Sequence, residues 1–181
     1  MQPGVTCGVS KRRNKESKRI IDGEKVVAGR YPWIVSIQLS SNIVGEWDHH
    51  CVGSLISPSA ILTAAHCTPL HRAQEPESAH SPGHYITARI VAGCEKWDDA
   101  ENDSRCQVII VMDTAFKFHP SYATNKRIDV SIVLLSYPFE MTEYVRTICL
   151  PPAGEYYQGM GTVAGYGWHS GLIAAKPHST M

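Results

Sequence analysis

The residues with the clearest chemical potential lie in one stretch, Ile61-Leu62-Thr63-Ala64-Ala65-His66-Cys67. An apolar, strand-like run leads to His66 through two alanines that are too small to crowd an imidazole, and Cys67 follows at once. Histidine is the side chain whose ordinary pKa lies closest to neutral pH, so it is suited to accept and return protons. The stretch therefore predicts a proton-transferring histidine. The alternative is a core histidine whose hydrogen bonds are satisfied.

A carboxylate that could orient this imidazole is Asp129, which directly precedes an apolar run at 130–135. A carboxylate that a strand carries into a core needs a hydrogen-bonding or charged partner, because burying it unpaired is costly. Asp129 is thus a candidate partner of His66. The alternative is an ordinary turn residue at the start of a strand.

Short strands separated by turns must position these two side chains. Runs of β-branched residues with a period of two predict strands. These runs cover residues 33–39, 51–56, 60–63, 85–92, 107–112, 129–135 and 162–166. No stretch has the period of a long amphipathic helix, so the chain is predicted to be all-β, with its strands in a barrel or a sandwich.

Composition excludes several classes of partner. The chain has 181 residues, and its 17 Lys and Arg balance its 17 Asp and Glu. Without a net charge or a basic face, nothing indicates nucleic acid as a partner. No apolar run is long enough to span a bilayer. We expect no nucleic-acid partner, no membrane partner and no cofactor.

The cysteines indicate the compartment. Their number is even, their spacing is wide, and none forms the Cys-x-x-Cys pair of redox and zinc sites; they are Cys7, Cys51, Cys67, Cys94, Cys106 and Cys149. This pattern predicts three disulfides and an extracellular protein, and it disfavours zinc. Residues 1–10 contain no apolar segment of the signal-peptide type, so we expect the N-terminus to be incomplete.

Three polar segments are predicted to lie on the surface. Residues 11–19 are basic, and ordered structure is expected to begin after them. Arg19-Ile20 lies at this boundary, and proteolytic cleavage concentrates at such places. The alternative is that residues 11–19 are simply a solvated tail. Residues 68–84 form a loop whose Glu75 and Glu77 could bind calcium, but such a pair is usually a solvated turn, so no metal is expected.

The third segment, residues 97–105, lies between Cys94 and Cys106, which indicates a loop closed by its own disulfide. It contains Asn102-Asp103-Ser104, the sequence pattern of an N-glycosylation site. Asn102 is therefore a glycosylation candidate, which is weak support for secretion because a three-residue pattern often arises by chance.

Several motifs follow one another in an order that identifies a family. They are Arg19-Ile20-Ile21-Asp22-Gly23, Tyr31-Pro32-Trp33, His50-Cys51-Val52-Gly53-Ser54-Leu55-Ile56, Leu62-Thr63-Ala64-Ala65-His66-Cys67, His119-Pro120-Ser121-Tyr122, Asp129-Val130-Ser131-Ile132-Val133-Leu134-Leu135, Ile148-Cys149-Leu150-Pro151 and Gly165-Tyr166-Gly167. With them, residues 20–168 resemble a trypsin/chymotrypsin-family serine protease. From about Gly171 the sequence is expected to depart from the family.

The resemblance implies a fold and an activity. Residues 20–148 would form the first antiparallel β-barrel of the two-barrel trypsin-like fold. Residues 149–181 would begin an incomplete second barrel, and residues 1–19 would be a basic propeptide. The family's activity is that of a serine endopeptidase, secreted as a zymogen, that acts on protein or peptide substrates.

The resemblance also assigns roles to single residues. His66 falls on the general base, and Asp129 falls on the aspartate that fixes the tautomer of the imidazole. Arg19-Ile20 falls on the site that an activating protease cleaves, although Asp22 stands where the family usually has glycine.

The same resemblance implies the disulfide pairing. Cys51 and Cys67 match the bridge beside the catalytic histidine. Cys7 and Cys149 match the bridge that keeps a propeptide attached after cleavage. Cys94 and Cys106 are left to pair with each other.

The family's nucleophile is missing from this sequence. It lies in a Gly-Asp-Ser-Gly-Gly segment, which does not occur among the 181 residues. Ser170-Gly171 comes too early in the family order. Asp103-Ser104-Arg105 lacks the glycines that let a backbone aim two N–H groups at an oxyanion.

Two functions are therefore open. The first is a secreted serine endopeptidase zymogen represented by an incomplete chain that is inactive as given. The second is a non-catalytic homologue that acts as a binding or regulatory module on a protein partner. Retention of both His66 and Asp129 favours the first. A secreted, disulfide-bonded β domain of unrelated function is the remaining alternative.

Overall fold

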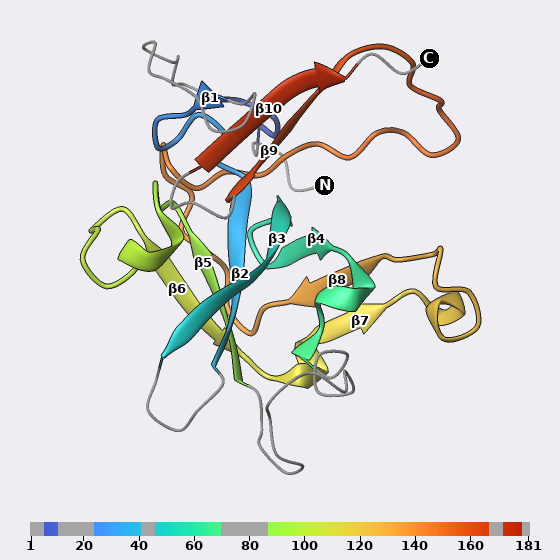
Figure 1. The fold of residues 1–181 in the computed structure, drawn as a ribbon, viewed down its shortest axis with the longest axis horizontal. Helices are drawn as coiled ribbons and strands as arrows, with labels where there is room; N and C mark the ends of the chain where they lie inside the picture. The colour runs from blue at the N-terminus through green and yellow to red at the C-terminus, as the bar shows by residue number, and fades with distance from the viewer. Residues whose placement is uncertain (1–5, 11–23, 41–45, 70–86, 167–171, 179–181) are drawn as a thin grey trace.

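A computed structural model describes residues 6–10, 24–40, 46–69, 87–166 and 172–178 of the chain. These residues form ten β-strands and four short 3-10 helices, which confirms the all-β prediction. The strands make two unequal sheets, with the larger sheet below the smaller one in Figure 1. The predicted cleavage site at Arg19-Ile20 and the acidic pair Glu75 and Glu77 lie outside the described residues.

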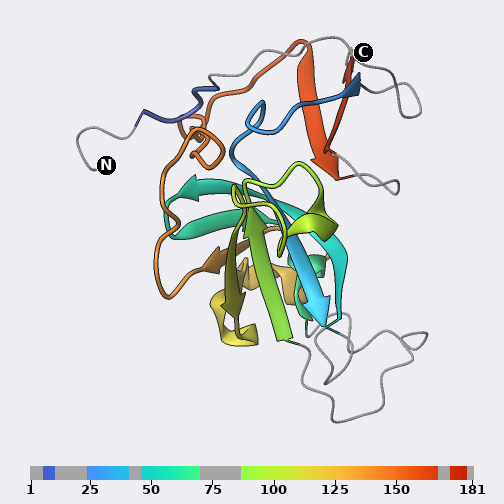
Figure 2. The same cartoon turned by 90° about the vertical axis from the view of Figure 1, so that its left-hand side faces the viewer.

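The larger sheet has seven antiparallel strands. They are β2 (Ile34–Ser40), β3 (Trp47–Ser57), β4 (Ala60–Thr63), β5 (Thr87–Ala92), β6 (Gln107–Val111), β7 (Phe116–Phe118) and β8 (Ser131–Leu134). Their order is β6-β5-β2-β3-β4-β8-β7. The two edge strands, β6 and β7, are separated in the chain only by Met112 and the 3-10 helix η3 (Asp113–Ala115), so the sheet must curl to bring its edges close. This curled sheet is the expected barrel (Figure 2).

Alternation along the strands explains the barrel's core. In β4 and β8, every second side chain is buried, as a period of two requires when one face of a strand packs inside. Leu55, Ile61 and Val133 are fully buried in the resulting cluster. Gly53 is needed beside them, because a Cβ at this position would lie 2.4 Å from Cγ2 of Ile61.

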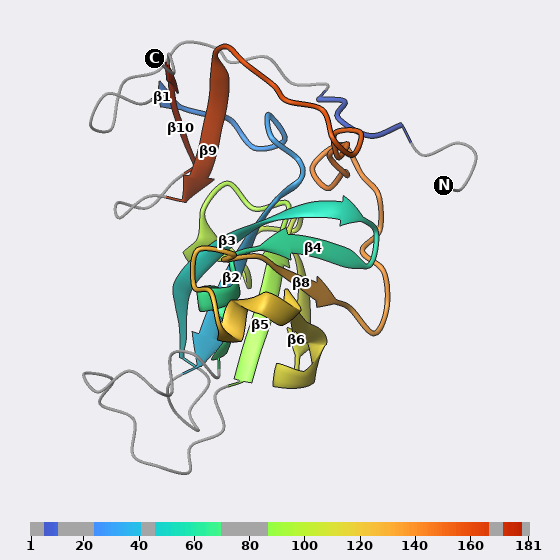
Figure 3. The same cartoon turned by 90° about the vertical axis from the view of Figure 1, so that its right-hand side faces the viewer.

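The smaller sheet, here called the outer sheet, has three antiparallel strands in the order β1-β10-β9. They are β1 (Glu24–Lys25), β9 (Gly161–Tyr166) and β10 (Leu172–His178). Figure 3 shows this sheet lying across one end of the barrel. Val26, Ile34 and Tyr166 form the small buried cluster between the two sheets.

Candidate active site

The register between β4 and β8 brings His66 and Asp129 together. Thr63, the last residue of β4, pairs with Ser131, the first residue of β8. His66 comes three residues after Thr63 in the 3-10 helix η1 (Ala65–Cys67), and Asp129 comes two residues before Ser131. Because the strands are antiparallel, both side chains lie at the same edge of the barrel.

Asp129 contacts His66 at two points. Its Oδ2 lies 2.6 Å from Nδ1 of the imidazole, and its Oδ1 accepts a hydrogen bond of 2.9 Å from the backbone N–H of His66. Two contacts fix both the position and the rotation of the ring relative to the carboxylate. The backbone contact was not foreseen from the sequence, because no residue type marks a main-chain donor.

The contact with Asp129 determines where the imidazole carries its proton. An ionised carboxylate only accepts hydrogen bonds, so Nδ1 of His66 must be the donor. In the neutral ring, Nε2 then keeps a lone pair that can accept a proton from another group. The His66 side chain is 53% exposed, so the ring is accessible from solvent.

The charge of Asp129 is stabilised by its donors. Burial would by itself raise the pKa of Asp129, but the hydrogen bonds from the ring and backbone of His66 outweigh burial and lower it. The backbone N–H of Ala65 acts in the same direction. The carboxylate therefore stays ionised at neutral pH and can stabilise a positive charge on the imidazole.

A disulfide fixes the backbone next to His66. Cys51 of β3 is bonded to Cys67, with 5.9 Å between their Cα atoms. Sγ of Cys67 lies 3.6 Å from Nε2 of His66, which is a weak contact. Cys51, His66 and Cys67 hold potential metal-ligating atoms within 4.8 Å of one another, but the two sulfurs are already bonded and are not available as thiolates.

Tyr122 is close enough to Asp129 to respond to its charge, and it was not singled out as a site residue from the sequence. It belongs to the 3-10 helix η4 (Pro120–Ala123) and is buried. Burial, and then the charge of Asp129, raise the pKa of Tyr122. Nζ of Lys126 lies 4.1 Å from the centre of its ring. The only sequence signal for Tyr122 was its place in the motif His119-Pro120-Ser121-Tyr122.

Four of the other predicted site residues are cysteines that lie away from His66 in the sequence and form two further disulfides. Cys7 is bonded to Cys149 across a separation of 142 residues, and the backbone N–H of Gly8 donates to Thr147 O at 2.8 Å. Cys94 is bonded to Cys106. Asn102 is exposed in the turn that this last disulfide closes.

Most of the chain is similar to known proteins. A family model with the description "Trypsin" matches residues 20–177, so the family's pattern continues past Gly171 and the expected departure at that point was wrong. Among curated proteins, the chain is similar to Ovochymase-2 of Mus musculus, with 28% identity over 153 residues. The match covers 82% of this chain and 22% of that relative, so the chain spans about a fifth of the relative's length.

Proposed function

Because this chain belongs to the trypsin family of serine proteases, we propose that it carries the proton-transfer half of a secreted serine endopeptidase made as a zymogen. In this proposal, residues 1–19 are the propeptide and residues 20–148 are the first barrel. Residues 149–181 are the start of the second barrel. Protein or peptide chains are the substrates, as the family's chemistry implies.

The observation that carries the proposal is the two-point contact between His66 and Asp129. Nε2 of His66 would take the proton of a serine hydroxyl as that oxygen attacks a peptide carbonyl, and would return it to the leaving amine. Asp129 would hold the tautomer and stabilise the imidazolium that forms between these steps.

The serine itself must come from outside these 181 residues, which contain no Gly-Asp-Ser-Gly-Gly segment. We therefore expect the 181 residues alone not to hydrolyse peptides. The alternative function, a binding or regulatory module, is favoured by this same feature. However, a binding or regulatory module would have no chemical reason to hold an exposed imidazole in place with a carboxylate and a neighbouring disulfide.

Labelling with a fluorophosphonate tests the proposal. The native protein would be captured from its source with an antibody to the barrel, cleaved after Arg19, and treated with the probe. Labelling of a product longer than 181 residues, with loss of labelling in His66→Ala and Asp129→Asn variants, is the expected result. A native product that ends at Met181 and takes no label would overturn the endopeptidase proposal and leave the binding module.

The 181-residue chain is the matched control for that experiment. It should not be labelled before or after cleavage at Arg19. Labelling that depends on His66 would mean that the chain contains its own nucleophile, and Ser170 would then be the first serine to substitute.

The Cys7–Cys149 disulfide gives a separate test of the zymogen assignment. Cleavage after Arg19 should release the propeptide only when the sample is also reduced, because the bridge joins it to the rest of the chain. A fragment that leaves under non-reducing conditions would contradict this arrangement. Arg19→Gln should abolish the cleavage.

Secretion is supported by the three disulfides, which persist in oxidising compartments. Asn102 offers a direct readout, because its side chain is exposed and the sequon is intact. Expression through a eukaryotic secretory route should give a form that loses mass with peptide-N-glycosidase, and Asn102→Gln should give the lower mass directly. Within the described residues, no helix has the length and apolar character needed to cross a membrane.

A further inference from the structure

Strand β6 presents a row of apolar side chains to solvent. Ile109 and Val111 are buried in the barrel core, so the alternate side chains lie on the outer face of the sheet. This apolar row consists of Val108, Ile110 and, directly after the strand, Met112, which are 39%, 60% and 69% exposed. Apolar side chains that are exposed singly need no explanation, but a contiguous row marks a surface where another chain can bind.

The neighbouring strand β5 is covered where β6 is not. Its outward side chain Val91 is fully buried by the loop that the Cys94–Cys106 disulfide closes. Val108 pairs with Val91 and is the least exposed residue of the apolar row, while Met112 is the most exposed. The cover that this loop provides therefore ends at the first residues of β6.

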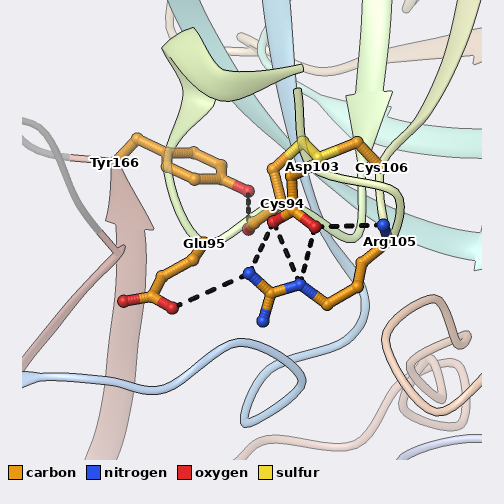
Figure 4. Close-up of polar contacts among 6 residues, drawn as sticks. All are labelled: Cys94, Glu95, Asp103, Arg105, Cys106 and Tyr166. Carbon is orange, nitrogen blue, oxygen red and sulfur yellow. Dashed lines mark hydrogen bonds and ion pairs between the residues drawn. A yellow bond between two sulfur atoms is a disulfide. The ribbon is translucent and has the colours of Figure 1, made fainter. Parts of the chain in front are cut away.

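Figure 4 shows that the loop is held by contacts of its own. Within it, Arg105 binds both carboxylate oxygens of Asp103 and reaches Glu95 at 3.9 Å. The Tyr166 hydroxyl donates to the carbonyl oxygen of Cys94 at 3.1 Å. A loop fixed at these points keeps its position over β5 and leaves the apolar row uncovered.

The backbone of β6 is open as well, because β6 is an edge strand of the seven-stranded sheet. In an antiparallel pair, alternate residues direct their N–H and C=O groups away from the partner strand. Among the described residues, the backbone of Val108 to Val111 has no hydrogen-bond partner outside β5. Beside Val108, the side-chain amide of Gln107 bonds the backbone N–H and C=O of Glu140, both at 2.9 Å. The open edge thus begins at Val108 and can accept one more strand.

The opposite edge of the sheet is protected in the usual ways. Strand β7 has only three residues, its central residue is the exposed Lys117, and Pro120 follows two residues after it. A short length, a lysine and a nearby proline each hinder the addition of a further strand. The run from Gln107 to Met112 contains no charged residue and no proline. Only one of the two edges is therefore open to strand addition.

The partner that fits this edge is a second copy of the same strand. In an antiparallel pairing centred on Ile110, Val108 of one copy faces Met112 of the other, so the two apolar rows meet side by side. The flanking residues Gln107 and Asp113 would lie opposite each other, which keeps like charges apart. The 17 basic and 17 acidic residues of the chain also balance, so two copies do not repel through net charge.

We propose that two copies of this chain associate through β6, with antiparallel strands centred on Ile110. The same surface serves both copies, so a two-fold axis closes the assembly at a dimer. Three side chains and one short strand from each copy make a small contact, which is typical of reversible association. The proposal goes beyond the endopeptidase function and does not depend on it, since β6 contributes no residue to the His66–Asp129 pair.

Sedimentation velocity of the 181-residue chain at rising micromolar concentrations is the first test. The wild type should show a reversible equilibrium between monomer and dimer, with no larger species. Ile110→Lys should weaken the dimer by about tenfold or more, because two ammonium groups would face each other at its centre. Since Ile110 is mostly exposed, the variant should keep the wild-type circular dichroism spectrum.

Two matched controls place the same charge on apolar surface elsewhere. Leu134 is 49% exposed but lies on β8, which is paired on one side by β4 and on the other by β7. Met160 is 72% exposed and lies in the segment before β9. Leu134→Lys and Met160→Lys should both dimerise like the wild type. A monomeric wild type, growth beyond a dimer, or an equal loss of association in either control would overturn the proposal.

Cysteine cross-linking tests the register without requiring a charge substitution. The six native cysteines are all in disulfides, so they give no background. On mild oxidation, Ile110→Cys should form a disulfide-linked dimer, because residues directly opposite in an antiparallel pair lie close together. Val108→Cys should link to Met112→Cys when the two variants are mixed, and each should link poorly to itself. Equal or better linking of Val108→Cys to itself would contradict the antiparallel register and overturn the proposed dimer.

Discussion

The barrel and the outer sheet differ in how they are held together. Leu55, Ile61 and Val133 are fully buried in a continuous core that spans the seven strands of the barrel. In the outer sheet, Val163 is 58% exposed, and its link to the barrel is the small cluster around Tyr166. Among the residues that the structure describes, the barrel therefore has a core of its own, whereas the outer sheet meets it at one small cluster.

The proposed proton-transfer pair belongs entirely to the barrel. His66 and Asp129 both follow from strand pairing inside the barrel, so their geometry does not need the outer sheet. His49 instead lies where the two regions meet. Regions with few buried apolar contacts open at lower free energy than cores do, so we expect the junction to open without disturbing the contact between His66 and Asp129.

The largest expected effect comes from the barrel core. Ile61→Ala should lower the free energy of unfolding by about 3 kcal/mol, because it removes fully buried methyl groups and leaves a cavity. Val163→Ala in β9 should change it by no more than about 0.5 kcal/mol, since that side chain is mostly exposed. Urea denaturation followed by circular dichroism measures both. Equal losses would show that the outer sheet shares one core with the barrel.

The junction gives an intermediate effect. Tyr166→Phe keeps the ring but leaves Cys94 O without its donor, so it should cost about 1 kcal/mol. The loss should appear as faster hydrogen exchange in β9 with little change in β2 and β3. Tyr157→Phe is the matched control, because its hydroxyl bonds Glu155 on an exposed segment and should matter little. A uniform loss of protection after Tyr166→Phe would contradict an independent barrel.

The sequence predicted the strands of the barrel better than those of the outer sheet, because the two regions differ in how much side-chain surface they bury. Strands that bury one face carry a visible period of two, as in residues 60–63 and 107–112, and β4 and β6 were found within a residue or two. Strand β7 has three residues, too few to show a period, and was missed. Strand β10 contains Lys176 and Pro177 and has no alternation, so it was missed as well.

The candidate site shows the same limit. His66 and Asp129 were predicted as a pair because both lie beside apolar strands and because the family resemblance placed them together. The hydrogen bonds that join Arg89, Gln38, Ser36 and His49 left no local signal, since these residues come from three separate strands and each is an ordinary polar residue by itself. Such networks are set by how strands align, which composition and periodicity do not record.

A smaller effect of opposite sign is expected at Ser131. Its side chain is buried in the barrel, and within the described residues its Oγ has no hydrogen-bond partner. Ser131→Ala should therefore stabilise the barrel by up to about 1 kcal/mol, because an unsatisfied hydroxyl is costly to bury. Ser36→Ala is the matched control: that serine is equally buried but bonded to His49, and its removal should destabilise. Urea denaturation distinguishes the two, and a loss of stability in Ser131→Ala would reveal a partner for this hydroxyl.

The smallest expected effect concerns the acid–base pair itself. Since its donors lower the pKa of Asp129, the carboxylate stabilises the fold above its ordinary pKa of about 3.9, and this contribution is lost as the pH falls through the lowered value. With the side chain 35% exposed, solvent screening should keep the contribution below about 0.5 kcal/mol. Carbon NMR titration of Asp129 should show a higher pKa in His66→Ala than in the wild type, whereas His119→Ala should leave it unchanged. The backbone N–H of residue 66 remains in either variant, so the rise should be partial. An unchanged pKa in His66→Ala would mean that the ring does not contact Asp129 in solution. Strand pairing inside the barrel would then not be sufficient to fix the geometry of the pair.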